Sequence, residues 1–371
     1  MSEDNILPVF PEEVNLFKPA QMNVAERAVR WKTWNPTFLE PNAPQRALFT
    51  YPNVGTDFVD LARTELYMKV RIVEKGTTKN FVQDETNSAM PIDLILQTMW
   101  QNVVVKLNGQ IVSSSNNTYA YKAFFEYLLS STEESKRYQG SLMGAAPDTR
   151  YWNAVDPFKA PFNTGLNTRA TWFKKVDRGV TETAEKPAQT TVEFVGKLFA
   201  DICNQERYLL NETQIEIALI PNSDKFRLMI LGDKEASLYI DEISLKVCHV
   251  SLEPALKMQI DKIMDPRDKG KDDLLLPAIY PMGRVVVTPL PIAKHSYQMI
   301  KTDLWQGEVP SRVLVGLVDS GAYQGDYKKN PFYFDHFNIS NIAFKLGNED
   351  VPSEPLTIDV EGANYVQGLA S

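Results

Sequence analysis

Hydrophobic and polar residues alternate along much of this chain with a period of two. Within 65–74, the apolar residues Leu66, Met68, Val70 and Ile72 occupy every second position. A period of two predicts a β-strand with one buried face. Similar patterns rich in β-branched residues predict further strands at 213–220, 239–249, 284–287, 312–318 and 341–346.

A β-hairpin is predicted around Asn108-Gly109, which separates the apolar run 103–107 from 110–112. Asparagine followed by glycine supplies the two positive φ values that a type I′ turn requires.

Helices are few in the predicted fold. The residues Tyr121, Phe124, Phe125, Leu128 and Leu129 follow the spacing of an amphipathic helix, with Asn117 or Thr118 as its cap. A second helix is predicted from Pro254 to Met264. The charged stretch that follows it, 265–273, is the best interdomain linker in the sequence.

The stretch 102–110 (NVVVKLNGQ) resembles 341–349 (NIAFKLGNE) at an offset of 239 positions. Two copies of one β unit would explain the match, and chance similarity between two hairpins would also explain it. About 140 residues separate the first stretch from residue 250, whereas only 22 follow Glu349. A second unit of the same fold is therefore expected to lack its later strands here, with unpaired edges.

Four segments are expected. Residues 1–45 are rich in proline and aromatic residues and are predicted to form an extended arm over the core or over a neighbouring subunit. Residues 46–250 form the first β unit, 251–279 a linker helix and charged linker, and 280–371 the partial second unit.

The 371 residues carry a formal net charge of −8, and the longest basic cluster is Lys174, Lys175 and Arg178. Backbone binding to nucleic acid needs a concentrated basic surface, so direct binding to nucleic acid is not expected. No apolar run approaches the roughly 18 residues that span a bilayer, and the acidic start does not resemble a secretory signal.

Signatures of the common enzyme classes are missing. The sequence has no GxGxxG, GxxxxGK[ST], HExxH or GxSxG motif. Its two cysteines are Cys203 and Cys248, too few for a disulfide framework. Cys248 and His249 would point to opposite faces of a strand, and a buried cysteine beside an edge histidine is expected rather than a catalytic pair. In 265–273, Arg267 and Lys269 occupy positions where a calcium loop needs Asp or Asn.

The aromatic residues Phe332, Tyr333, Phe334 and Phe337 are expected to be core, with a stacking platform for bases or sugars as the alternative. The sequons at Asn116, Asn211 and Asn338 do not predict glycosylation without a secretory signal. The spacing of a carboxylate pair for glycoside hydrolysis is a distance in space, so the sequence neither indicates nor excludes such a pair. No catalytic, cofactor-binding or metal-binding residue is predicted, no cofactor is expected, and the protein is expected not to be an enzyme.

Five segments of the chain resemble the double jelly-roll major capsid proteins of Polinton/Maverick elements and adintoviruses. The most specific is GLVDSGAYQGDYKKNPF, in which Gly325-Asp326-Tyr327 precedes Asn330-Pro331-Phe332. The resemblance runs from about residue 14 to the end and rests on 59–67, 101–112 with its following helix, 209–221, 316–332 and 351–356.

The resemblance implies an all-β fold of two tandem jelly-roll barrels, the second incomplete at its C-terminal end. It implies a structural virion protein that forms homotrimeric, pseudo-hexagonal capsomers of an icosahedral double-stranded DNA virus or virus-like transposon. Neighbouring capsomers and minor capsid proteins are the expected partners. The expected location is the virion capsid, after synthesis in the host cytoplasm and assembly there or in the nucleus. The alternatives are a carbohydrate-binding jelly-roll protein and a minor capsid protein at the vertices.

Overall fold

The computed structural model describes residues 25–358 except 53–54, 84–85, 150, 154–155, 157–158, 160–162, 174–190, 265–277, 303, 305–308 and 348. Residues 1–24 of the expected arm, the charged stretch 265–273 and the basic cluster around Lys174 therefore lie outside the described residues.

The first of two large sheets contains four antiparallel strands in the order β1-β11-β4-β8. They are β1 (Glu26–Trp34), β4 (Phe58–Glu74), β8 (Val192–Lys197) and β11 (Ala236–Leu252). The two long central strands, β4 and β11, pair from Glu74 opposite Ala236 to Phe58 opposite Val250. The alternation predicted for β4 is confirmed, because Leu66, Met68, Val70 and Ile72 are all buried.

The second large sheet contains five strands in the order β2-β3-β9-β6-β7. They are β2 (Phe38–Leu39), β3 (Ala47–Tyr51), β6 (Trp100–Leu107), β7 (Gln110–Ser114) and β9 (Ile215–Pro221). The predicted hairpin joins β6 to β7. Asn108 and Gly109 have φ of 49° and 79°, as the type I′ turn requires.

The strand order of these sheets is that of a jelly roll. Leaving aside the two-residue β2 and the short pair β5 (Ser88–Pro91) and β10 (Leu228–Leu231), eight strands remain. Numbered one to eight along the chain, they form the sheets 1-8-3-6 and 2-7-4-5. Every connection except the hairpin crosses from one sheet to the other, which is the double Greek key of a jelly roll. No hydrogen-bonded strand pair joins the two large sheets within the described residues, so this first unit (residues 26–252) is a two-sheet sandwich rather than a closed barrel.

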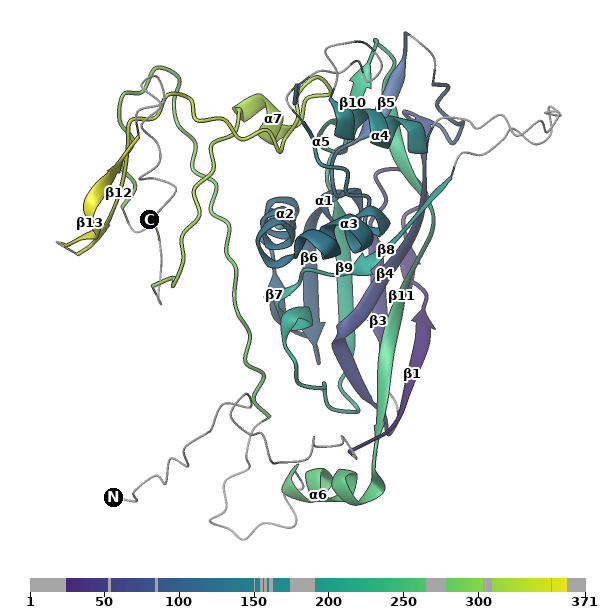
Figure 1. Ribbon diagram of the computed structural model, residues 1–371. Helices are drawn as coiled ribbons and strands as arrows, with labels where there is room; N and C mark the ends of the chain where they lie inside the picture. Colours follow the sequence, from purple (N-terminus) through teal and green to yellow (C-terminus); the bar gives the residue numbers. More distant parts are fainter. Residues whose placement is uncertain are drawn as a thin grey trace, which may run out of the picture.

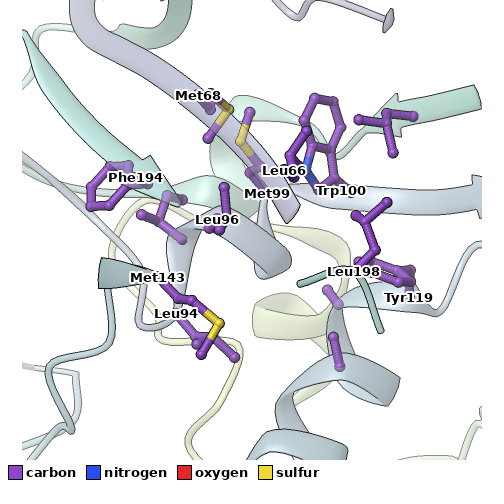
Figure 2. Packing of buried hydrophobic residues seen from close by; sticks show 14 of the residues in the cluster. Leu66, Met68, Leu94, Leu96, Met99, Trp100, Tyr119, Met143, Phe194 and Leu198 are labelled. Carbon is purple, nitrogen blue, oxygen red and sulfur yellow. The ribbon is translucent and has the colours of Figure 1, made fainter. Parts of the chain in front are cut away.

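Buried residues from both sheets form a single core cluster. Figure 2 shows Leu66 and Met68 of β4 near Met99 and Trp100, and Met143 beside Leu94. At Gly196 of β8, a Cβ atom would lie 2.4 Å from Cγ of Met143, so glycine is needed for this close packing.

The helices lie at the sides and ends of the sandwich (Figure 1). They are α1 (Ile95–Thr98), α2 (Tyr119–Ser130), α3 (Glu133–Leu142), α4 (Thr164–Trp172), the 3-10 helix η2 (Asp201–Asn204), α5 (Asp224–Arg227), α6 (Pro254–Met264) and α7 (Ser320–Gln324). The predicted helices are confirmed as α2 and α6. Thr118 stands at the N-cap of α2, but its hydroxyl donates to the carbonyl of Ser115 instead of capping the helix.

The described residues 278–358, here called the second unit, contain one strand pair. It joins β12 (Asn341–Leu346) to β13 (Glu349–Thr357) as an antiparallel hairpin. Gly347 at its turn has φ of 65°, and it stands where the repeat places Asn108 in the first unit. The strand predicted at 341–346 is therefore confirmed, and both halves of the repeat fold as hairpins.

The strands predicted at 284–287 and 312–318 are not formed. Both segments are extended and mostly exposed, and a single bridge from Val318 to Phe334 is the nearest they come to a ladder. The first unit shows the physical reason. Its early strands β1, β3 and β4 pair with the late strands β8, β9 and β11, and never with one another. Among the eight jelly-roll strands only the β6–β7 hairpin is local, and its counterpart is the strand pair that forms in the second unit.

The start of the first unit also differs from expectation. Residues 26–34, assigned to the arm, form β1 and pair with β11 from Glu26 opposite Leu252 to Trp34 opposite Leu245. The jelly-roll strands therefore begin before residue 46.

Candidate functional site at the contact between the two units

Helix α2 presents an aromatic face that receives a loop from the second unit. This docking segment (residues 316–335) contains α7. Phe332 of the docking segment is only 1% exposed and stacks on Phe124, with ring centroids 4.4 Å apart. Tyr121 contacts Phe332 and donates a hydrogen bond of 3.2 Å to the carbonyl of Pro331. The helical spacing of Tyr121 and Phe124 thus builds a pocket for one side chain of the second unit.

Further aromatic residues extend this contact on both sides of Phe332. Tyr323 of α7 stacks on Tyr121 at 5.6 Å, and Phe334 lies 5.1 Å from Phe125. The expected core position is therefore confirmed for Phe332 and for the partly buried Phe334. It is wrong for Phe337, which is 55% exposed.

A buried carboxylate fixes the docking segment next to the aromatic contact. Asn330 is fully buried, and its Nδ2 donates a hydrogen bond of 2.7 Å to Oδ2 of Asp148. The other oxygen, Oδ1, accepts from Nδ2 of Asn163 at 2.8 Å and from the guanidinium of Arg169 at 2.6 Å. A buried charge is tolerated when it is paired and hydrogen-bonded in this way.

Arg169 organises the polar cluster from within the first unit. It comes from α4, is fully buried, and also donates a hydrogen bond of 2.8 Å to the carbonyl of Pro91. Asp93 lies 3.8 Å from Arg169 and accepts from the backbone amides of Leu94 and Ala146. Burial raises the pKa of Asp93, an effect that Arg169 opposes.

Strand β10 holds the remaining part of the docking segment through backbone groups. The carbonyl of Tyr327 accepts a hydrogen bond of 2.9 Å from the amide of Ile230. Nζ of Lys328 donates to the carbonyls of Ile230 at 2.8 Å and Gly232 at 2.9 Å. Burial, assisted by Asp224, raises the pKa of Tyr327 to about 12, so its hydroxyl stays protonated and donates to the carbonyl of Ala236.

Helix α7, within the docking segment, has a regular N-cap. The Asp319 side chain accepts from the amides of Gly321 and Ala322 and pairs with Lys329 at 2.7 Å. The hydrogen bond from Lys329 lowers the pKa of Asp319. At Gly325, φ is 101° and the backbone lies close to the amide of Phe226. A side chain at this position would be strained and crowded.

The block 325–332, which is the most specific part of the sequence resemblance, therefore lies within the docking segment, whose Tyr323 and Phe334 also contact the first unit. Sequence reasoning missed Asp148, Asn163 and Arg169. Asn163 and Arg169 follow Asp148 by 15 and 21 positions, a spacing that matches no local pattern, and Asn330 lies 182 positions from Asp148.

The two cysteines and His249 lie outside the contact between α2 and the docking segment. Cys203 and Cys248 are buried free thiols. His249 is also buried, in an interior strand rather than at an edge as expected, and its ring meets Trp34 and Tyr51 at 5.8 Å. Within the described residues, no group of three or more His, Cys, Asp or Glu side chains is placed to hold a metal. None of the helices in that part of the chain combines the length and the apolar character needed to traverse a bilayer.

Comparisons with known proteins add relatives of low identity. No family model matches the chain. An uncharacterized protein of Caenorhabditis elegans is 23% identical over 325 residues, which cover 86% of this chain and 70% of that protein.

The structural neighbours are viral major capsid proteins. A chain of the Sputnik virophage is 13% identical at a TM-score of 0.40, and the alignment covers 67% of this chain and 53% of that one. The Faustovirus major capsid protein is 10% identical at a TM-score of 0.36, with coverages of 67% and 58%. The mavirus major capsid protein is 12% identical at 0.32, with coverages of 68% and 53%. The chain thus spans little more than half the length of these solved chains.

Proposed function

We propose that this chain is a structural subunit of a virion shell, a major capsid protein of the double jelly-roll type. The observation that carries the proposal is a sandwich of jelly-roll strand order followed by a second copy of its β6–β7 hairpin. The sequence resemblance to Polinton/Maverick and adintovirus capsid proteins supports the same assignment. The particle would be icosahedral and contain double-stranded DNA.

The docking segment gives this proposal a physical basis. A shell subunit has to keep its two modules in a fixed relative orientation. Two modules joined only by a loose tether would not keep that orientation. Phe332 and Asn330 of the second unit are both buried in the first, one among aromatic rings and the other on Asp148. Such a contact fixes the direction in which the second module leaves the first.

In this proposal, the extended segments 284–287 and 312–318 are early strands of a second jelly roll. Their partners would be the counterparts of β8, β9 and β11, as in the first unit. Exposed apolar side chains along these segments, such as Val286 at 67% and Leu314 at 57%, agree with a sheet face that needs a covering layer.

Three such subunits would supply six similar modules, so a trimer would have a pseudo-hexagonal outline and would tile a shell. The proposed partners are two further copies of the chain, neighbouring capsomers and minor capsid proteins. The net charge of −8 favours a shell protein that leaves the genome to other proteins. We propose no enzymatic activity, and a location in the virion after synthesis in the host cytoplasm.

Negative-stain electron microscopy of the purified full chain tests this proposal, with glycan-array binding measured on the same sample. The proposal predicts hexagonal particles or sheets and no specific glycan binding. Particles without threefold or hexagonal outline that bind a defined glycan would instead indicate the carbohydrate-binding class.

A further inference from the structure

A second cluster of charged residues lies beneath α2, on the side that faces the sandwich. Lys122 is only 2% exposed, and its Nζ donates to Oδ1 of Asp201 at 2.5 Å and to the carbonyl of Phe199 at 2.8 Å. Asp201 is 6% exposed and begins the 3-10 helix η2, which follows β8. An amine and a carboxyl group are therefore held together out of water, on elements 79 residues apart in the chain.

Glu126 lies one helical turn from Lys122. Its Oε1 is 3.5 Å from Nζ of Lys122, while Oε2 is buried and has no hydrogen-bond partner within the described residues. Burial raises the pKa of Glu126, an effect that Lys122 opposes. Tyr119, Phe199 and Cys203 are buried around the cluster.

We propose that Lys122 and Asp201 condense to an intramolecular isopeptide bond, with Glu126 as the proton-transfer group. The contact supplies proximity between the amine and the carboxyl group, and Glu126 supplies a group for proton transfer beside them. The Lys122 side chain is 3% exposed and the Glu126 side chain 14% exposed, and neither an oxidant nor a cofactor is needed. Lysine is a nucleophile in its neutral form.

The step balances in atoms and charge. A proton first passes from the Lys122 ammonium to the Asp201 carboxylate, leaving both groups neutral. The nitrogen lone pair attacks Cγ of Asp201 while Glu126 protonates the carbonyl oxygen. Glu126 then takes a proton from the nitrogen and returns one to the leaving hydroxyl, so that the C–O bond breaks and water departs. The amide oxygen, protonated in the first transfer from Glu126, finally gives its proton back to Glu126. One C–N bond forms, one water is lost, and Glu126 ends in its starting state.

The bond would join α2 to the segment between β8 and β9. Because α2 also supplies Tyr121 and Phe124 to the docking segment, the helix would be covalently anchored on one face and would hold the second unit on another. This inference stands independently of the proposed capsid role.

The test is the intact mass of the purified, folded full chain, followed by tryptic digestion. We expect a mass one water below the sequence value, about 18 Da. Trypsin should leave Lys122 uncleaved, and peptide 107–136 should be recovered joined to peptide 198–207. A full sequence mass with cleavage after Lys122 would overturn the proposal and leave an ordinary buried ion pair.

Variants separate the chemistry from folding. Glu126→Gln keeps the shape but removes the proton shuttle, so its mass should show no deficit. Asp201→Asn should condense with loss of ammonia, about 17 Da, because an amide can replace the acid. The matched control is Glu133→Gln in α3, whose side chain is 93% exposed and should leave the deficit of 18 Da intact. A deficit that persists in Glu126→Gln would contradict the role of Glu126. If any variant fails to fold, the mass of the unmodified sequence still decides the question.

Discussion

Asn330 donates a 2.7 Å hydrogen bond to Asp148 across 182 positions of the chain. Asp148 also holds Asn163 and Arg169, so a residue of the second unit completes a buried polar cluster of the first. Within the stretch 325–332, Asn330 and Phe332 therefore have partners in the first unit.

Replacing Asn330 by alanine should loosen the second unit from the first. The change removes a charge-assisted hydrogen bond and leaves Oδ2 of Asp148 buried without that donor, at a cost of about 1–3 kcal/mol. Limited proteolysis should show faster cleavage within 278–318. The control, Gln298→Ala, changes an exposed side chain and should leave the cleavage rate as it is. Equal rates for the two variants would contradict the role of Asn330.

Truncating Phe332 should have a larger effect. Phe332→Ala empties the space between Phe124 and Phe226, and large-to-small changes at buried phenylalanines cost about 3–5 kcal/mol. Thermal unfolding followed by near-ultraviolet circular dichroism should show a lower midpoint. Phe337→Ala, at a 55% exposed site only five residues away, is the control. The account fails at this point if both variants unfold at the same temperature.

Acid should weaken the first unit through His249. Both ring nitrogens of His249 are buried without hydrogen-bond partners in the described structure. Burial lowers the pKa of His249, assisted by Lys32 and opposed by Asp57. The unfolded chain therefore takes up a proton near pH 6.5 that the folded chain resists, and the free energy of unfolding decreases as the pH falls below that value.

The measurement is urea denaturation between pH 7.5 and 5, comparing His249→Gln with the unchanged chain. The pH-dependent loss due to this residue approaches about 1.4 kcal/mol per pH unit at most. It should vanish in His249→Gln and persist in His336→Gln, where the side chain is half exposed. A pH profile that His249→Gln does not alter would exclude His249 as the cause.

Local sequence patterns predicted two kinds of element: those formed by residues close together in the chain, and strands with one fully buried face. The strand β4, the turn at Asn108-Gly109 and the helix α6 all follow from their own residues. Strand β1 was missed because it is an edge strand with both faces largely exposed, as at the successive residues Val29, Arg30 and Trp31, so burial imposes no alternation. Composition alone therefore assigned it to an arm.

The contact between the two units could not be predicted from the sequence. The sequence predicted the aromatic spacing of α2 and singled out the block that includes 325–332. Nothing in either segment indicates that Phe332 stacks on Phe124. The same limit explains the strands predicted at 284–287 and 312–318. Their alternation is real, yet a strand forms only where a partner supplies the second half of its hydrogen bonds.

Hydrogen exchange should distinguish these two classes of segment. Amides in 284–287 and 312–318 lack ladder partners and should exchange within seconds to minutes, whereas those of β9 should be protected to the level of global unfolding. Mass spectrometry of the pepsin-digested chain measures both in one experiment. Strong protection of 284–287 in the isolated protein would mean that these residues are paired after all.

Native mass spectrometry of the purified full chain tests the capsid assignment most directly. The account predicts a dominant species of three times the 42.0 kDa chain mass, persisting on dilution to micromolar concentration. A species that stays at the single-chain mass at every concentration would contradict it.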